Sequence, residues 1–435
     1  MKLSVIGCGY LGAVHAASMT SLGHDVVGID VDESKIASLR AGRAPFFEPG
    51  LSAILESGLA SGRLAFSTDI AEAADADVHF IAVGTPQRRG AYAADLTYVD
   101  AAVAALVPML RPGVLVVGKS TVPIGTAAGL ADQIRETGAE LAWNPEFLRE
   151  GFAVQDTVTP DRLVYGVPEG ESGVAARATL DRVYRDAVAA GTPVVVTDYA
   201  TAELVKVAAN AFLATKISFI NAMAEISEVV GADVTHLADA IGHDARIGRR
   251  FLNAGVGFGG GCLPKDIRAF VARAEELGRG ESVAFLTQVD AINRRRRDRV
   301  VELALAAVGG EPHRARVAVL GLAFKPDSDD VRDSPALDVA VRLHGLGVDV
   351  VATDPEAVPN ARRLHPQLSF TAAPEDALQG ADAVVLVTEW PEYRALDPVI
   401  VGGLVRNRTI IDGRNVLDPA AWRAAGWTYR GMGRP

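Results

Sequence analysis

The stretch "LSVIGCGYLGAVHAASMTSLGHDVVGID", residues 3–30, decides the fold of the N-terminal part of the chain. It opens with a short apolar run that is typical of a buried parallel strand. Gly7, Gly9 and Gly12 follow in a G-x-G-x-x-G pattern, then come a helical pattern and a second strand that closes on Asp30. This order predicts a dinucleotide-binding βαβ unit.

Each residue type in this motif has a physical role. Gly7 allows a tight turn, Gly9 lets the backbone approach a pyrophosphate, and Gly12 lets helix and strand pack closely. The helix N-terminus offers N–H groups and a positive dipole end to phosphate. Asp30 can accept hydrogen bonds from a ribose and would repel a 2′-phosphate, so the pattern predicts NAD rather than NADP. We interpret Cys8, inside the turn, as a small packing residue.

The alternation of strands and helices continues beyond this unit. In doubly wound sheets the carboxyl ends of the strands face the ligand, so Thr85, Thr121 and Glu146 are expected to point into the binding crevice. The first domain is expected to end at about residue 197. Its further strands are expected within residues 76–86, 113–126, 139–147, 162–167 and 193–198.

A long helix is predicted over residues 199–230, which contain neither proline nor glycine. Thr197 or Asp198 can cap its N-terminus. A helix this long and apolar must be covered on more than one side. We therefore expect it to join two domains and to pack against a second subunit in a homodimer. Lys206 and Asn210, four residues apart, share one face of it.

The last third of the chain repeats the first. "LGVDVVATD" at 346–354 matches "LGHDVVGID" at 22–30, but only Gly321 remains of the three glycines. A second phosphate cradle is therefore not expected, and this half should hold another ligand or close over the first. The predicted fold class is α/β, with two Rossmann-like doubly wound domains joined by a long central helix. The expected domains are an NAD-binding domain at 1–197, a central helical dimerisation region with the cysteine loop at 198–305, and a second Rossmann-like, ligand-binding domain at 306–435.

Composition limits the functional classes. The chain has 435 residues, 49% hydrophobic residues, two cysteines and a net charge of −11. The acidic charge argues against nucleic-acid binding, and the two cysteines suit a reducing compartment. No apolar stretch is expected to reach the ~20 residues of a membrane span. We expect a cytoplasmic protein without a metal site, and we interpret the arginine run at 294–297 as a solvated face.

The loop "GFGGGCLPKD", residues 257–266, places Cys262 behind three glycines. Buried cysteines in apolar elements are inert, and the loop could be a simple turn. However, residues 259–261 would let another molecule approach closely. Lys265 and Asp266 follow within four residues, and a nearby cation favours the nucleophilic thiolate. We interpret Cys262 as a nucleophile.

A nucleophilic thiol beside a nicotinamide implies specific chemistry. Oxidation of an alcohol gives an aldehyde, and a thiolate can add to that aldehyde as a thiohemiacetal. A second oxidation gives a thioester, from which water releases an acid. The expected net reaction converts an alcohol to a carboxylate with consumption of two NAD.

The chain resembles the UDP-glucose/GDP-mannose dehydrogenase family over nearly its whole length. The resemblance implies NAD-dependent four-electron oxidation of UDP-glucose to UDP-glucuronate through a thiohemiacetal and thioester on Cys262. It also implies two Rossmann-like domains joined by a long helix that forms the core of a dimer, with the domain at 306–435 binding the UDP-sugar. The motifs that carry it are "GCGYLG", "VGTP", "STVPIGT", "NPEFLREG", "PDRLVYG", "GFGGGCLPKD", "GLAFKPDSDDVRDSP", "DGRNV" and the helix with Lys206 and Asn210.

The resemblance also implies roles for individual residues. The catalytic set is Cys262 as nucleophile, Lys206 at the oxyanion, Asn210 and Asp266 as partners that place the lysine and a water, Thr121 and Glu150 as the water-activating group, and Glu146 in sugar binding and acid–base chemistry. The cofactor set is Gly7, Gly9, Tyr10, Leu11, Gly12, Asp30, Lys35, Thr85, Pro86, Thr121, Glu150, Lys265 and Arg332. The substrate set is Phe147, Leu148, Glu150, Lys206, Asn210, Arg246, Phe251, Asn253, Phe258, Gly259, Lys325 and Arg414.

Three details qualify these expectations. Arg246 is expected to reach the substrate of the neighbouring subunit. Glu146 and Glu150 would share a face if their segment were helical, the alternative being an exposed acidic helix. Gly261 stands where related patterns often have Ser or Tyr, and it is expected only to add room. Asn253 replaces a lysine of some members, which predicts one diphosphate contact fewer.

Other functions stay open at this point. The same chemistry could act on GDP-mannose or another NDP-hexose, although "CLPKD" separates the chain from UDP-N-acetylhexosamine dehydrogenases. A two-electron β-hydroxyacid dehydrogenase also has a Rossmann domain and a long helix, but it needs neither Cys262 nor the second half. A catalytically inactive cofactor-binding protein would not need the set of Cys262, Lys206, Asn210 and Asp266.

Overall fold

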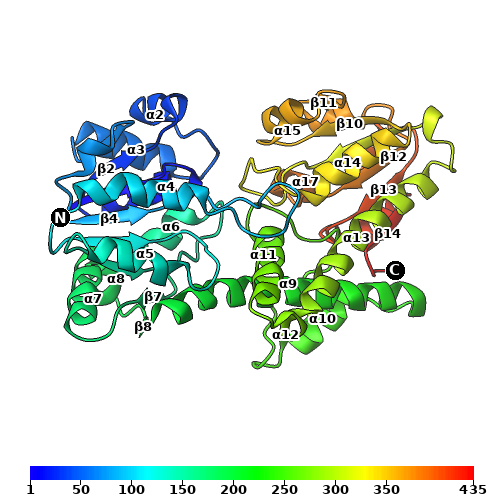
Figure 1. Cartoon of the computed structure of the whole chain (residues 1–435). Coiled ribbons are helices and arrows are strands. Elements are labelled where there is room, and N and C mark those ends of the chain that lie inside the picture. The colour runs from blue at the N-terminus through cyan, green and yellow to red at the C-terminus, as the bar shows by residue number, and fades with distance from the viewer. The chain divides into compact units, whose positions relative to one another are not determined.

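The computed structural model describes all 435 residues and separates into two compact units. The first comprises Met1–Ala209 and Ala272–Gly280, and the second comprises Asn210–Val271 and Glu281–Pro435. Each contains one sheet with helices packed on it (Figure 1). The predicted fold class, two doubly wound α/β domains connected by a long helix, is confirmed.

The first unit is built on an eight-stranded sheet in the order β3-β2-β1-β4-β5-β6-β7-β8. All neighbouring strands are parallel except β6 and β7, which are antiparallel. The strands are β1 (Lys2–Ile6), β2 (Asp25–Ile29), β3 (Leu64–Ser67), β4 (Val78–Ile81), β5 (Leu115–Gly118), β6 (Glu140–Trp143), β7 (Leu163–Gly166) and β8 (Val194–Thr197).

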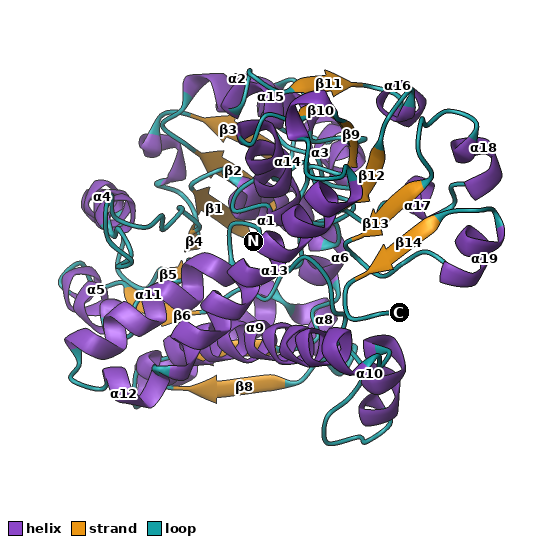
Figure 2. Cartoon of the chain, turned by 90° about the vertical axis from the view of Figure 1, so that its right-hand side faces the viewer, coloured by secondary structure: helices purple, strands orange, loops and turns teal.

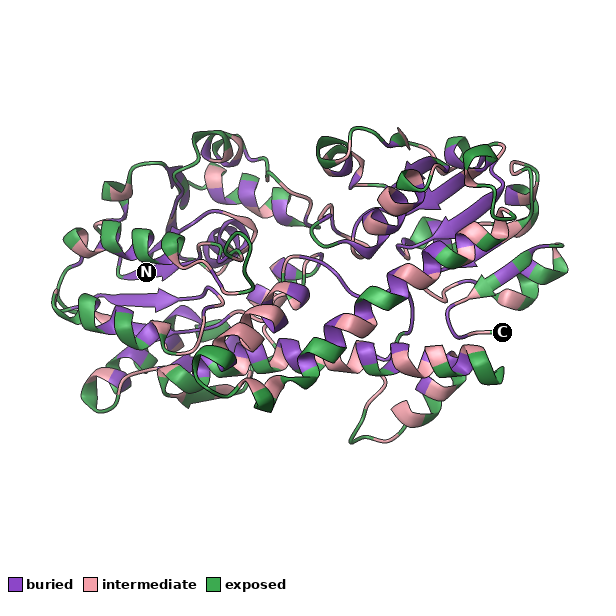
Figure 3. Cartoon of the chain, turned by 45° about the vertical axis from the view of Figure 1, so that its right-hand side comes forward, coloured by how far each residue is buried: buried purple, intermediate pink, exposed green.

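Two apolar clusters hold the first sheet between its helices. The strands β1, β4 and β5 are buried along almost their whole length, as is typical of parallel strands covered on both faces (Figure 3). The helices are α1 (Tyr10–Ser21), α2 (Glu33–Arg40), α3 (Leu51–Ala60), α4 (Thr97–Leu106), α5 (Thr126–Arg135), α6 (Ala153–Val158), α7 (Glu171–Val183) and α8 (Arg185–Ala189), with short 3₁₀ turns at Ile70–Ala73 and Val107–Met109.

The predicted long helix is α9, Tyr199–Val230, with 32 residues. Asp198 caps it, because its carboxylate accepts a hydrogen bond from the Thr201 N–H at 2.8 Å. α9 begins in the first unit and continues into the second. Buried and exposed residues alternate along it (Figure 3), as expected of a helix with one covered face.

By length and composition alone, α9 could cross a membrane. The expectation that no apolar stretch would reach this length was therefore wrong. The core helix of a soluble protein passes the same test, and α9 carries buried polar side chains that are bonded inside the protein. Asn221 accepts a hydrogen bond from the Gly255 N–H, and the Ser218 hydroxyl donates to the Val289 carbonyl.

The second unit contains an all-parallel six-stranded sheet in the order β11-β10-β9-β12-β13-β14. Figure 2 shows its strands β12, β13 and β14 side by side. One large apolar cluster surrounds this sheet. The strands are β9 (Arg316–Leu320), β10 (Asp349–Thr353), β11 (Ser369–Thr371), β12 (Ala383–Leu386), β13 (Thr409–Asp412) and β14 (Thr428–Gly431).

The helices that begin after α9 fall into two sets. Those that precede the second sheet in sequence are α10 (Val234–Gly242), α11 (Leu263–Glu276), α12 (Gly280–Val283) and α13 (Phe285–Ala307), and a 3₁₀ turn at Pro312–Arg314 follows them. Those between and after its strands are α14 (Pro335–Gly345), α15 (Val358–Leu364), α16 (Pro374–Leu378), α17 (Pro391–Arg394), α18 (Pro398–Gly402) and α19 (Pro419–Ala424).

The arginine run on α13 corrects the expectation of a solvated face. Arg296 and Arg297 are buried, whereas Arg294 and Arg295 are about half exposed. Arg296 pairs with Glu228 at 2.8 Å, and Arg297 bonds the carbonyl of Asp333 at 3.1 Å. A helix turns by 100° per residue, so four consecutive residues cannot all face water on a helix packed on one side.

Candidate functional site

The glycine-rich turn after β1 has the geometry of a phosphate cradle. Gly7 has a φ of +92°, which an L side chain would strain, and a Cβ on Gly12 would lie 1.7 Å from the Gly7 carbonyl oxygen. Gly9 faces open space and supplies no side chain at the start of α1. The first-turn N–H groups of α1 are thus accessible to an anion.

Asp30 lies directly after β2 at the edge of this cradle. Its carboxylate accepts a hydrogen bond from the Cys8 N–H at 2.8 Å and pairs with Lys35 at 2.8 Å. The Cys8 side chain is fully buried, and burial raises the pKa of its thiol far above the usual range. Cys8 is therefore a packing residue, as predicted. The turn, the helix N-terminus and the acid together fit the adenosine diphosphate part of NAD.

The equivalent turn in the second unit is closed. Gly321 repeats Gly7, with a φ of +109°. However, the N–H groups of Leu322 and Ala323 both donate to the buried carboxylate of Asp354, at 2.7 and 3.0 Å. The Trp390 indole N–H donates to the same oxygen at 3.1 Å. Asp354 thus satisfies two N–H groups of this turn, whereas in the first unit Asp30 accepts from the Cys8 N–H and the Gly9 position stays open.

Glu48, which the sequence analysis did not single out, connects α1 to the loop that carries Glu150. Its carboxylate accepts hydrogen bonds from the Tyr10 hydroxyl and from the N–H groups of Gly151 and Ala153, the latter two at 2.6 and 2.7 Å. Glu48 thereby satisfies the N-terminus of α6. Glutamates are rarely buried unless they have partners, so the burial of Glu48 indicates a structural or functional role, but this burial cannot be read from the sequence.

Glu146 and Lys206 form a buried ion pair in the first unit. Lys206 Nζ lies 2.9 Å from Glu146 Oε1, and the side chains are 6% and 12% exposed, respectively. The other oxygen, Oε2, accepts a hydrogen bond from the Leu148 N–H at 2.6 Å. The residues after β6 form a loop and not a helix, so the condition under which Glu146 and Glu150 would share a helical face is not met, and the alternative of an exposed acidic helix was wrong.

Two further groups of predicted residues meet in the first unit. The Phe147 ring lies between two cations, with the Arg162 guanidinium 3.9 Å and Lys206 Nζ 5.6 Å from its centroid. The Thr85 hydroxyl donates to the Thr121 carbonyl at 2.7 Å. The carboxyl ends of β4, β5 and β6 thus gather the expected polar residues at one edge of the sheet.

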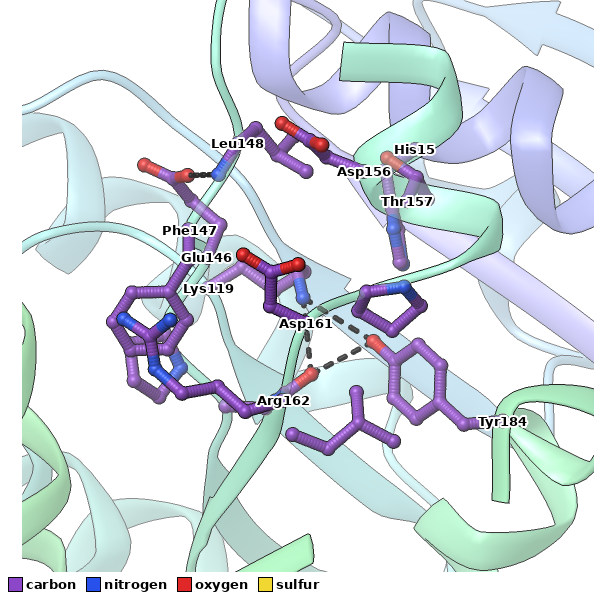
Figure 4. A pocket seen from close by; sticks show the side chains of 14 residues that line it. His15, Lys119, Glu146, Phe147, Leu148, Asp156, Thr157, Asp161, Arg162 and Tyr184 are labelled. Atoms are coloured by element: carbon purple, nitrogen blue, oxygen red, sulfur yellow. Dashed lines mark hydrogen bonds between the residues drawn. The ribbon is translucent and has the colours of Figure 1, made fainter. Parts of the chain in front are cut away.

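A cavity of about 40 Å³ lies behind the Glu146 segment (Figure 4). It is lined by Lys119, Asn144 and Tyr184, none of which the sequence analysis named, together with Phe147 and Leu148. Lys119 directly precedes the serine of the "STVPIGT" motif. Its position one residue after a buried strand was visible in the sequence, but its partners lie 25 and 65 residues away.

In the second unit, Cys262 stands directly before the 14-residue helix α11 and is exposed. Asp266, in the first turn of α11, is buried. It accepts a hydrogen bond from the Asn210 amide at 2.6 Å and pairs with Lys265 at 2.9 Å. The dipole of α11 favours negative charge on an atom at this helix end.

The three glycines before Cys262 are packed against the 324–335 loop. A Cβ on Gly259 would lie 2.4 Å from the Asp333 carbonyl, and one on Gly260 would lie 2.8 Å from the Phe324 ring. A Cβ on Gly261 would lie 2.4 Å from the centre of the Arg332 guanidinium. The room beside Gly261 is therefore taken by the guanidinium of Arg332, the flexible end of a largely exposed side chain.

Arg414 holds three loops together. Its guanidinium donates to the carbonyls of Gly257, Phe324 and Val387 at 2.9, 3.0 and 2.8 Å. Asn293 fixes the same glycine-rich loop, because its amide group exchanges two hydrogen bonds with the Phe258 backbone. Cys262 therefore follows a loop with a fixed backbone path.

The remaining predicted substrate residues lie in loops of the second unit. Phe251 has a left-handed φ of +66°, which is strained for an aromatic residue. The Asn253 amide oxygen accepts a hydrogen bond from Arg249 at 2.8 Å. Arg246 is 89% exposed and pairs with Asp244. Lys325, also predicted on the substrate side, lies over the Phe324 ring, and Arg332, which was predicted on the cofactor side, pairs with Asp330.

Each unit therefore gathers part of the predicted set. The first brings together the glycine cradle and Asp30, Thr85 with Thr121, and Glu146 with Phe147 and Lys206. The second brings together Cys262, Asn210, Lys265 and Asp266, with Gly259, Phe258, Lys325, Arg332 and Arg414 in the loops around them.

Comparison with known proteins identifies three consecutive matches to one family, the UDP-glucose/GDP-mannose dehydrogenase family. Residues 1–188 match its NAD binding domain, residues 200–295 its central domain and residues 318–419 its UDP binding domain.

Individual relatives match over the whole chain. The chain is 44% identical over 440 residues to UDP-glucose 6-dehydrogenase of Rhizobium meliloti (strain 1021), covering 100% of both chains. It is 41% identical to UDP-glucose 6-dehydrogenase TuaD of Bacillus subtilis (strain 168), covering 100% of this chain and 93% of the relative. The solved structure of a UDP-glucose dehydrogenase from the archaeon Pyrobaculum islandicum superposes with a TM-score of 0.90 at 40% identity, covering 100% and 98% of the two chains.

Proposed function

The chain belongs to the UDP-glucose/GDP-mannose dehydrogenase family, and from that premise we propose that it oxidises UDP-glucose to UDP-glucuronate with NAD. The observation that carries the proposal is the full-length similarity to UDP-glucose 6-dehydrogenases in a chain that also has an exposed cysteine at the start of a helix. The Gly7, Gly9 and Gly12 cradle with Asp30 is the expected seat of NAD, which accepts two electrons in each of the two oxidations.

Cys262 is proposed to carry the second half of the reaction. Its thiolate adds to the C6 aldehyde, so that a carbon–sulfur bond forms and the carbonyl oxygen becomes an alkoxide. Loss of two electrons and a proton from this thiohemiacetal gives a thioester. Water then attacks the thioester, the carbon–sulfur bond breaks and the thiolate is regenerated. In total, CH₂OH and one water become a carboxylate, four electrons pass to two NAD⁺, and protons are released.

Lys206 is proposed to stabilise the oxyanion that forms in these steps. An ammonium held in a buried site by a carboxylate needs no reorganisation when negative charge develops beside it. Glu146 is proposed to orient Lys206 and to contact the sugar. Asn210 and Asp266, bonded at 2.6 Å, are proposed to place a water, with Thr121 and Glu150 as the water-activating group.

The remaining candidates are proposed as binding residues. Those on the cofactor side are Tyr10, Leu11, Lys35, Thr85, Pro86, Lys265 and Arg332. Those on the substrate side are Phe147, Leu148, Arg246, Phe251, Asn253, Phe258, Gly259, Lys325 and Arg414. The strained backbone of Phe251 supports this assignment, because strain of this kind is concentrated at ligand sites. We also propose the functional boundaries 1–197, 198–305 and 306–435.

The stoichiometry of NADH tests the proposed reaction. With UDP-glucose as limiting substrate and excess NAD, we expect two NADH per sugar and UDP-glucuronate as the product, measured by absorbance at 340 nm and mass spectrometry. One NADH per substrate would instead identify a two-electron dehydrogenase. The same assay across a panel of NDP-hexoses, GDP-mannose included, ranks the substrates, and a faster rate with GDP-mannose would replace UDP-glucose as the substrate.

We propose that the enzyme is a homodimer that uses the exposed face of α9. The second unit exposes Phe212, Phe219 and Ile226 at intervals of seven residues, which places them on one stripe of this helix. A row of exposed large apolar side chains along one helix face is typical of a surface that binds another protein chain. Neither cysteine forms a disulfide, which supports the proposal of a reducing, cytoplasmic environment.

A charge in this stripe should dissociate the dimer. We expect Phe219→Glu to weaken dimerisation by roughly 100-fold or more, because a carboxylate would be buried without a partner. Light scattering coupled to size-exclusion chromatography measures this directly. Val174→Glu, at an exposed valine on α7 outside this stripe, is the matched control and should leave the mass unchanged. A native chain that is already monomeric at micromolar concentration would contradict the dimer proposal.

A further inference from the structure

Lys119 is a buried lysine in the first unit that the mechanism above does not use. It follows β5 directly, and its side chain is almost inaccessible to solvent. Nζ donates hydrogen bonds to Asn144 Oδ1 at 2.9 Å and to the Tyr184 hydroxyl at 3.2 Å. The Tyr184 hydroxyl donates to the same Asn144 oxygen at 2.7 Å, which closes a triangle of polar groups (Figure 4).

This triangle fixes the start of the segment that carries Glu146. The Asn144 amide N–H donates to the Val164 carbonyl at 2.9 Å, which ties the end of β6 to β7 where the two strands run antiparallel. Glu146 follows Asn144 by two residues, and its own carboxylate is held by Lys206 and by the Leu148 N–H. The position of Glu146 therefore depends on contacts at both ends of this short loop.

Charged and titratable groups surround Lys119 from several elements. His15 of α1 lines the same cavity, and its Nε2 is buried without a hydrogen-bond partner. Phe80 of β4 and Tyr184 present their rings to the ammonium, at 6.0 and 5.6 Å from the ring centroids. Four other charged groups line the cavity: Glu146, Asp156, Asp161 and Arg162. Asp156 pairs with Arg149, and the Arg162 guanidinium lies over the Phe147 ring.

The electrostatic balance couples Lys119 to the catalytic pair. The pKa of Lys119 is lowered to about 8, mainly by burial; the carboxylate of Glu146 opposes this shift and the charge of Lys206 adds to it. Lys119 is therefore mostly charged at pH 7 and loses its charge within the range in which enzymes are assayed. Burying an amine without full compensation costs several kcal/mol, and an apolar side chain of similar size would be as stable or more so. Stability alone does not explain a lysine at this position.

We propose that Lys119 is a positioning residue for the reaction: through Asn144 and Tyr184 it fixes the Glu146 loop, and it places a positive charge in the cavity beside the ion pair of Glu146 and Lys206. This inference rests on the proposed function, since it assigns Lys119 a role in the same site. It identifies Lys119 as the third charged member of a buried cluster with Glu146 and Lys206.

The first experiment compares Lys119→Met and Lys119→Arg with the native enzyme from pH 6 to pH 10. We expect kcat of Lys119→Met to be about 10- to 100-fold lower at pH 7, since small displacements of catalytic groups have effects of this size. The deficit should shrink above pH 8, where the native lysine loses its own charge. Lys119→Arg stays charged, and the adjoining cavity has room for its larger guanidinium group. This variant should therefore keep most of the native rate at pH 7. A deficit that is independent of pH, or no deficit, would overturn the inference.

The second experiment needs no turnover. NMR of protein with ¹³C-labelled lysine side chains should show one lysine that titrates near pH 8 and whose signal is missing in Lys119→Arg. Glu146→Gln removes the neighbouring carboxylate and should move this titration to lower pH. A titration that does not respond to Glu146→Gln would overturn the coupling. If instead the native enzyme oxidises no NDP-hexose, the proposed function fails while this titration still reports on the cluster.

Discussion

Cys262→Ala is expected to abolish acid formation while leaving NAD binding intact. The variant removes the only atom that can form the thioester, and removal of a covalent nucleophile costs roughly 10³-fold or more in kcat. The glycine cradle after β1 belongs to the first unit, whereas Cys262 belongs to the second. The substitution therefore leaves the residues of the cradle unchanged. Product formation followed by mass spectrometry, with NAD affinity measured by fluorescence titration, separates the two effects.

The second cysteine provides the matched control. Cys8→Ala removes a buried sulfur from the core of the first unit and should lower stability by about 1 kcal/mol while keeping turnover. Iodoacetamide should modify one thiol per native chain, since Cys262 is exposed and Cys8 is buried. Activity should fall in parallel with this modification. Near-native acid formation by Cys262→Ala would refute the thioester mechanism.

Lys206→Met is expected to lower kcat by roughly 10²- to 10³-fold, the usual cost of losing one electrostatic contact to a developing oxyanion. It also removes the ammonium 2.9 Å from Glu146 Oε1, which leaves this nearly buried carboxylate less well compensated. Steady-state kinetics at saturating NAD and UDP-glucose measure the effect.

The control for this variant is Lys2→Met, an exposed lysine at the start of β1, which should keep the native kcat. NAD affinity should be unchanged in both variants, because neither residue belongs to the glycine cradle. An equal loss of kcat in both, or none in Lys206→Met, would exclude Lys206 from the oxyanion role.

Much of the fold was predictable because its signals are local. The sequence of strand, glycine-rich turn, helix and acid within residues 3–30 specifies one βαβ geometry, and the structure reproduces it. The same holds for α9, whose bounds follow from the absence of helix breakers and from the Asp198 cap. The repeat at Gly321 and Asp354 predicted the second sheet, although not that Asp354 closes its own turn.

Other features were decided by tertiary contacts between residues far apart in sequence. β7 runs antiparallel to β6, which no periodicity reveals, because pairing direction depends on the path of the connecting chain. The burial of Arg296 and Arg297 depends on acidic partners 68 and 36 residues away. From sequence, Gly261 predicts open space beside Cys262; only the structure shows that the following loop places the Arg332 guanidinium there.

The sequence by itself determined the cofactor turn, the long helix and the two-sheet architecture, and it singled out Cys262 as the proposed nucleophile, since each depends on residues within one local segment. Only the tertiary structure decided which side chains are desolvated together: Glu146 with Lys206, and Lys119 with Asn144 and Tyr184. The reason is physical. Charge and hydrogen-bonding strength depend on burial and on distances of a few ångströms between segments, and neither is encoded in the spacing of residues along the chain.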